Sequence, residues 1–143
     1  MIAVDTNVLV YAHREGLDLH EAALERLAAI AEGLEPWGLP VFCAGEFVRV
    51  VTHPKIFTPP STLEQALAAL KAVLQSPSLL LLSPGERYLD LFEDCVREAD
   101  ARGNLAFDAQ IAAVCLEHGA KHLLTADRDF SRFSKLQTLS ITT

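Results

Sequence analysis

The chain has 143 residues, half of them hydrophobic and 22% charged, so it can bury a core, and an intrinsically disordered chain is excluded. Its net charge of −7 argues against binding along a nucleic-acid duplex, which usually requires a basic face. No apolar run reaches the roughly 18–20 residues of a membrane span, and no basic segment precedes the first apolar stretch as in a signal peptide. We expect a cytoplasmic protein whose residues 1–143 form a single domain.

Short apolar runs and amphipathic segments alternate along the first half of the chain. A capping box starting at Ser61 or Thr62 is expected to open one of its helices, with Glu64 or Gln65 as the acceptor. The predicted elements are a buried strand at 2–4, a helix at 17–31, a turn-rich connector at 36–40, a strand at 41–43, a helix at 44–53 and a helix at 63–74.

The second half continues the alternation. Residues 79–82 predict a strand that is apolar on both faces, as a central parallel strand is. A long helix should begin at Ser83-Pro84 with Leu89 facing inward, followed by a helix at 107–118, a strand at 121–125, a short helical turn and a weaker strand at 136–141. This order predicts a three-layer α/β/α sandwich around a parallel sheet of about five strands.

Four acidic residues occupy special positions in this pattern. Asp5 and Asp127 directly follow predicted strands, whereas Glu46 and Asp108 should lie in the first turns of helices. In right-handed crossovers the ends of strands and the starts of helices share the carboxyl edge of the sheet, where open α/β sheets bind ligands. Carboxylates about 5 Å apart repel by roughly 3 kcal/mol at an effective dielectric near 20. The cluster therefore predicts one or two divalent cations, and oxygen ligands favour Mg²⁺ or Mn²⁺.

Other polar residues leave alternatives open. A single acid at the start of a helix is most often a cap. Asp129 competes with Asp127, and we expect one to bind metal and the other to cap the short turn, with Asp127 favoured as the ligand. Basic residues surround the acids unevenly and are candidate contacts for a phosphodiester substrate: Arg49, Lys55, Arg128 and Arg132. The histidines and cysteines form no zinc-binding pattern.

Four stretches carry a family resemblance: residues 4–9 (VDTNVL), 45–54 (GEFVRVVTHP), 103–113 (GNLAFDAQIAA) and 125–130 (TADRDF). With these stretches in this order, the chain resembles PIN-domain ribonucleases, specifically VapC-type toxins of bacterial type II toxin–antitoxin pairs. The resemblance implies an α/β/α fold and Mg²⁺- or Mn²⁺-dependent cleavage of RNA. It also implies a homodimer and inhibition by a VapB-like antitoxin.

Carried over by position, the resemblance makes Asp5, Glu46, Asp108 and Asp127 the catalytic, metal-binding quartet. Residues that orient these ligands or the substrate would be Thr6, Asn7, Thr125 and Asp129. Ala126 departs from the pattern, because close relatives often have asparagine there.

Two other interpretations of the acids remain. A phosphatase of the haloacid dehalogenase type also begins with an aspartate after its first strand, but it needs a second aspartate where this chain has Asn7. A non-catalytic partner-binding domain could use its acids only to stabilise helix starts. Its melting temperature would then respond little to Mg²⁺ or Mn²⁺.

Overall fold

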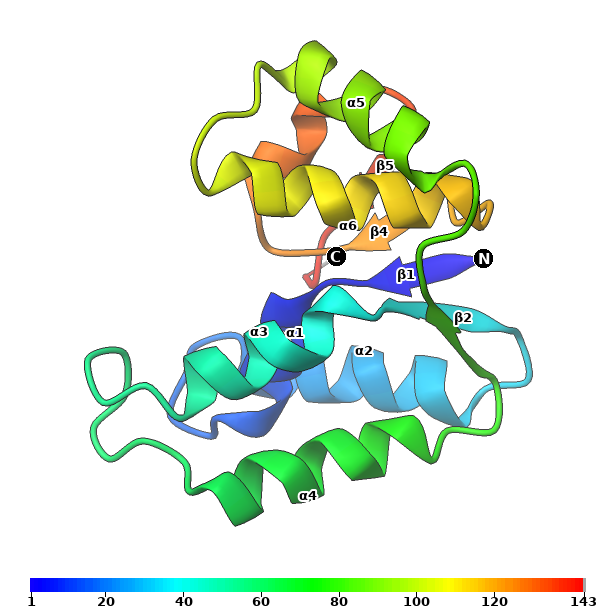
Figure 1. Ribbon diagram of the computed structural model, residues 1–143. Coiled ribbons are helices and arrows are strands. Elements are labelled where there is room, and N and C mark those ends of the chain that lie inside the picture. Colours follow the sequence, from blue (N-terminus) through cyan, green and yellow to red (C-terminus); the bar gives the residue numbers. More distant parts are fainter. Residues whose placement is uncertain (143) are drawn as a thin grey trace.

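The computed structural model describes residues 1–142 and contains a parallel sheet of five strands in the order β3-β2-β1-β4-β5. Helices α1 to α4 cover one face, and α5 and α6 cover the other (Figure 1). The predicted α/β/α sandwich is therefore confirmed.

The strands are β1 (Ile2–Val4), β2 (Trp37–Pro40), β3 (Leu79–Leu82), β4 (His122–Leu124) and β5 (Gln137–Leu139). The helices are α1 (Thr6–His13), α2 (His20–Glu32), α3 (Phe42–Val51), α4 (Leu63–Leu74), α5 (Tyr88–Ala99), α6 (Leu105–Glu117) and the 3-10 helix η1 (Arg128–Arg132).

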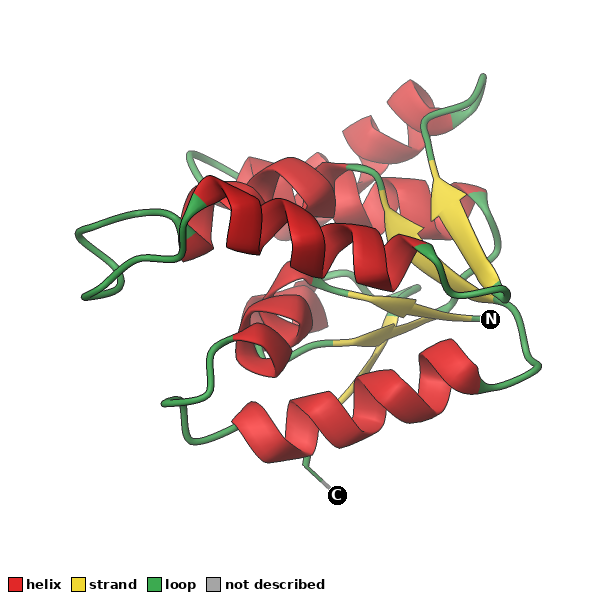
Figure 2. Cartoon of the chain, turned by 90° about the horizontal axis from the view of Figure 1, so that it is seen from below, coloured by secondary structure: helices red, strands yellow, loops and turns green. Residues whose placement is uncertain are grey.

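Strand β1 is the central strand of the sheet and pairs with β2 and β4. Ala3 pairs with Gly38 of β2 on one side and with Leu123 of β4 on the other. Ala3, Val4, Leu123 and Leu124 are completely buried, as expected for parallel strands covered on both faces. Because β1 and β4 are adjacent, the residues that follow them also lie side by side. Figure 2 shows the strands with helices on both sides of them.

The second strand lies at Trp37–Pro40 and not at 41–43. The expected connector at 36–40 is therefore wrong, and α3 begins at Phe42. Gly38 and Pro40 look like turn residues locally, but long-range packing decides their conformation. The Trp37 indole is 1% exposed and donates a hydrogen bond to Ser76 Oγ at 3.0 Å, and Gly38 lies against the side chain of Leu82.

The third strand also differs from its expected position, since β3 is an edge strand and Leu80 and Leu81 are about half exposed. Helix α5 begins at Tyr88 and not at residues 83–84, because residues before it form a loop whose backbone N–H groups donate to the Glu117 carboxylate. Leu89 is 72% exposed and does not face inward, because Tyr88, Cys95 and Ala99 form the buried face of α5.

The remaining helix boundaries follow the sequence more closely. Thr62 caps α4, and its side chain and that of Gln65 form both bonds of the predicted capping box. Helix α2 starts three residues later than expected and α6 two residues earlier. Glu46 lies in the second turn of α3 rather than the first. None of the described helices is long and apolar enough to cross a membrane.

The packing of β2 against β3 can be tested with Gly38→Ala. A Cβ atom at this position would lie 2.7 Å from Leu82 Cδ1 and 3.0 Å from its Cγ. We expect a loss of about 1–3 kcal/mol in the free energy of unfolding, because a buried side chain must be displaced. Urea denaturation measures the loss. Combining Gly38→Ala with Leu82→Ala should cost less than the sum of the two changes, and strictly additive costs would contradict this contact.

Candidate active site

A cleft of about 720 Å³ opens at the carboxyl edge of the sheet, between α3, the start of α6 and the segment after β4. Three of the four predicted acids, Glu46, Asp108 and Asp127, line this cleft together with Asp129. Asp5 is 3% exposed and is not among the lining residues. Arg49 and seven residues for which we expected no functional role complete the lining: Phe42, Gly45, Asn104, Leu105, Phe107, Gln110 and Ile111.

Asp5 is held from both sides by hydrogen bonds. Its Oδ1 accepts from the backbone N–H of Thr6 at 2.7 Å, which makes Asp5 the N-cap of α1. Its Oδ2 accepts from the hydroxyl of Thr125 at 2.7 Å. These two bonds tie the end of β1 to the end of β4 and fix the direction of the carboxylate.

Thr125 is the centre of a wider network. Its Oγ1 also accepts from the backbone N–H of Asp127 at 3.0 Å and from the side-chain amide of Asn7 at 3.2 Å. The Asn7 oxygen in turn accepts from the backbone N–H of Ala126 at 3.2 Å. Residue 126 enters this network through its backbone, so a side chain shorter than asparagine does not break it.

The cap of the short helix η1 is not the residue that we expected. Asp127, not Asp129, caps the short helix η1, because its Oδ1 accepts from the backbone N–H of Asp129 at 2.9 Å. One carboxylate oxygen each from Asp108, Asp127 and Asp129 lies within 4.8 Å of the other two. Asp129 therefore joins the predicted ligand cluster, where its Oδ1 also lies 3.6 Å from Nε of Arg132.

The electrostatics of the cleft reflect this crowding. Burial, followed by the charges of Asp127, Asp5, Glu46 and Asp129, raises the pKa of Asp108 from 3.8 to about 7. Burial raises the pKa of Asp5 to about 6, and the hydrogen bonds from Thr125 and Thr6 offset part of this rise. The four acids thus oppose the ionisation of Asp108 together, and a cation among them would relieve this repulsion.

Several features fit a divalent cation in this place. The available donors are carboxylate oxygens, without histidine or thiolate in the cluster, and this set suits Mg²⁺ or Mn²⁺. Within residues 1–142, Asp5, Glu46 and Asp108 form no salt bridge with lysine or arginine. The buried hydroxyl of Thr6, beside Asp5, has no hydrogen-bond partner in the same part of the chain.

The four candidate RNA contacts are separated by the fold. Arg49 lines the acidic cleft. Arg128 is exposed and lines a neighbouring hollow of about 320 Å³ beside Thr125 and Ile141. Arg132 lies against Asp129, and Lys55 is exposed in the loop between α3 and α4, outside the cleft lining.

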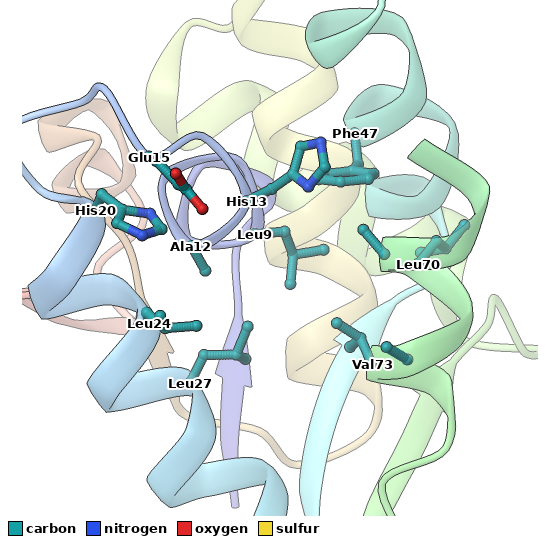
Figure 3. Close-up of a pocket in the computed structure, with 12 residues that line it drawn as sticks. Leu9, Ala12, His13, Glu15, His20, Leu24, Leu27, Phe47, Leu70 and Val73 are labelled. Carbon is teal, nitrogen blue, oxygen red and sulfur yellow. The ribbon is translucent and has the colours of Figure 1, made fainter. Parts of the chain in front are cut away.

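A second concave surface lies between α1, α2 and α4 (Figure 3). This apolar groove has a volume of about 330 Å³. In Figure 3 the side chains of Leu24 and Leu27 from α2 lie opposite those of Leu70 and Val73 from α4. Leu9 of α1 lies between the two pairs. Glu15 and His20 lie at one end of the groove. Leu24 and Leu27 of α2 thus contribute to the groove, and Leu24 stays 48% exposed.

Comparisons with known proteins show the family of the chain. The family model described as PIN domain matches residues 2–136. The chain belongs to the PIN-domain family. Within that family it is 42% identical over 137 residues to VapC ribonuclease Mb2897 of Mycobacterium bovis, covering 96% of this chain and 92% of the relative. It is 34% identical to Ribonuclease VapC25 of Mycobacterium tuberculosis, covering 96% of both chains.

Solved structures share the fold at lower identity. The VapBC2 structure from Rickettsia felis, bound to a promoter DNA fragment, has a chain that matches with a TM-score of 0.67 at 21% identity, covering 98% of both chains. VapC20 of Mycobacterium tuberculosis, described as a Sarcin-Ricin loop cleaving toxin, matches with a TM-score of 0.62 at 20% identity, covering 92% of this chain and 93% of that one.

The raised pKa values predict how pH acts on the metal-free protein. Because the folded pKa of Asp108 exceeds 3.8 and reaches about 7, the folded state binds its proton more tightly than the unfolded state does. Its contribution to stability is therefore present at low pH and is lost as pH rises from about 4 to 7. In a chelating buffer at pH 8, we expect the free energy of unfolding of Asp108→Asn to be higher than that of the unsubstituted protein, because asparagine carries no charge. The difference should be on the order of 1–2 kcal/mol, since solvent screens part of the repulsion.

This advantage should shrink toward pH 5, as measured by urea denaturation at both pH values. Asp94→Asn, which changes an exposed acid on α5, should show no such trend. An Asp108→Asn protein that is equally destabilised at both pH values would contradict the assigned repulsion.

Proposed function

We propose that this chain is a metal-dependent endoribonuclease, the toxin of a type II toxin–antitoxin pair, which hydrolyses RNA phosphodiester bonds in the cytoplasm. The observation that carries the proposal is the carboxyl-edge cleft, which Glu46, Asp108, Asp127 and Asp129 line, with Asp5 buried at the end of the adjacent strand β1. The 42% identity to a protein named VapC ribonuclease supports RNA as the substrate.

Asp5 and Asp108 would hold the main Mg²⁺ or Mn²⁺ ion, with Glu46 and Asp127 completing its ligands or those of a second ion. Asp129 is an additional candidate, since its carboxylate lies with those of Asp108 and Asp127. The bound ion supplies a water of lowered pKa and neutralises charge that develops on the phosphate.

The other residues would keep this arrangement rigid and guide the substrate. Thr125 and the Thr6 backbone fix the Asp5 carboxylate, and Asn7 holds residues 125 and 126 in place. Arg49 would pair with an RNA phosphate in the cleft, because its guanidinium can donate two parallel hydrogen bonds to phosphate oxygens.

The two alternative functions fit the site less well. A phosphatase would need an acid at position 7, and Asn7 instead uses both ends of its amide in hydrogen bonds to Thr125 and Ala126. A binding domain whose acids only cap helices accounts for Asp5 and Asp127. It does not account for Glu46 and Asp108, whose carboxylates form no hydrogen bond with another described residue and lie inside the cleft.

A thermal melt with and without Mn²⁺ tests the metal site. We expect Mn²⁺ to raise the melting temperature of the unsubstituted protein, since a ligand at 100 times its Kd stabilises by about 2.7 kcal/mol. Asp108→Asn should lose most of this rise and slow RNA cleavage by at least about 100-fold, as expected when a metal ligand that stabilises the transition state is lost. Asp94→Asn serves as the matched control. An Asp108→Asn protein with the full Mn²⁺ response and the full cleavage rate would refute the assignment.

We also propose that a VapB-like antitoxin inhibits the chain and that the toxin forms a homodimer. The apolar groove between α1, α2 and α4 suits an amphipathic helix of the antitoxin, because leucines and a valine from three helices line it (Figure 3). An arginine of such a partner could then reach the neighbouring acidic cleft and pair with its carboxylates.

Leu24→Glu tests the groove. Leu24 is 48% exposed, so we expect the melting temperature to change little. Affinity for the antitoxin should fall by at least about tenfold, because a charge would be buried against an apolar helix. The measurement is co-purification, followed by titration, with the product of a small adjacent reading frame. Leu89→Glu, on α5 across the sheet, is the control. Equal affinity of both variants would exclude this groove as the binding site.

A further inference from the structure

The acidic cleft is also lined by Gly45 of α3 and Phe107 of α6. Neither residue has a side chain that can bind a metal ion. We propose that this part of the cleft binds an unpaired nucleotide of the RNA next to the cleaved bond, with its backbone passing over Gly45 and its base stacked on Phe107. This inference rests on the proposed ribonuclease function and names how the substrate is held.

Neither packing nor backbone conformation requires a glycine at position 45. It is the fourth residue of α3, and glycine is among the least favourable residues inside a helix. Its backbone φ is not in the left-handed region, and a Cβ atom there would meet no other atom within 4 Å. Neither packing nor backbone conformation excludes alanine. The space above Gly45, one residue before Glu46 and within the cleft, is therefore left for a group from outside the chain.

Phe107 is unusual in the opposite sense, since it is large, apolar and 58% exposed. No other Phe, Tyr or Trp of the described residues belongs to the exposed class. It directly precedes Asp108 and lines the same cleft, so a base stacked on it would lie close to a phosphate at the metal site. Bases of single-stranded RNA commonly stack on aromatic side chains of this kind.

The polar lining of the cleft favours a nucleotide over an apolar protein segment. Arg49 can bind a phosphate, and the amides of Asn104 and Gln110 can form hydrogen bonds with base edges or ribose hydroxyls. A helix with an apolar face would instead have to cover Glu46, Asp127 and Asp129 in this cleft. The apolar groove on α1, α2 and α4 offers such a helix a better surface.

The experiment measures binding of two fluorescent oligomer pools by anisotropy, in Ca²⁺ to slow cleavage. One is a random-sequence single-stranded RNA, and the other is an abasic oligomer with the same sugar–phosphate backbone. Phe107→Ala should bind the RNA about tenfold more weakly and the abasic oligomer unchanged, while Phe107→Trp should restore RNA binding. Leu89→Ala, which also truncates an exposed apolar side chain, is the matched control.

Gly45→Ala should separate stability from function. We expect its melting temperature to rise by about 2–4 °C, since alanine favours the helix, while its affinity for both oligomers falls by about tenfold because the methyl group fills the path of the backbone. Gly16→Ala is the control, because a Cβ atom there also meets nothing within 4 Å but lies outside the cleft.

The outcomes distinguish this inference from the proposed function. Variants at 45 and 107 that bind RNA like the unsubstituted protein, while Asp108→Asn still abolishes cleavage, would overturn the inference alone. An unsubstituted protein that neither binds nor cleaves RNA would overturn both. If Phe107→Ala dissociates a dimer in sedimentation without weakening RNA binding, Phe107 belongs to an interface between copies, and the inference is also overturned.

Discussion

The site depends on how several like charges are kept together at one edge of the sheet. Asp108 has a pKa of about 7 because burial and four neighbouring acids oppose its ionisation. Without a metal ion, the ionised carboxylates of the cleft therefore repel one another. The hydrogen bond between Thr125 and Asp5 joins the ends of β1 and β4 and prevents the carboxylates from moving apart to relieve this repulsion. A protein arranged in this way is prepared for a cation before the cation arrives, which is the condition for tight and well-directed binding.

The same network explains why small polar residues surround the acids. The Thr125 hydroxyl donates to Asp5 and accepts from Asn7 and Asp127, so a single oxygen atom joins residues 5–7 to residues 125–127. Asn7 reaches residue 126 through the backbone. Short hydrogen bonds at the sheet edge therefore set the positions of Asp5 and Asp127, whereas helices α3 and α6 position Glu46 and Asp108. Surface charges elsewhere contribute little.

Sequence reasoning predicted the sheet class and the edge at which the acids gather, because alternating strands and helices place Asp5 and Asp127 there whatever the strand order. Their closeness required β1 and β4 to be adjacent, and no local pattern contains that information. Residues 37–40 were assigned to a connector for a similar reason. Gly38 and Pro40 favour turns locally, whereas the contact with Leu82, far along the chain, places them in a strand. The run at 79–82 is apolar enough for a central strand but lies at an edge. Composition alone therefore does not predict the position of a strand within the sheet.

Gly45 and Phe107 lie in the stretches that carry the family resemblance, but the sequence alone indicates no role for either residue. Gly45 lowers the helix preference of α3 and Phe107 exposes a large apolar ring, so each opposes the local rules that make a fold predictable. Departures of this kind persist mainly where binding or catalysis compensates for them. Both departures lie in the one cleft that also concentrates the carboxylates. Their coincidence makes substrate contact a more economical explanation than two unrelated accidents of packing.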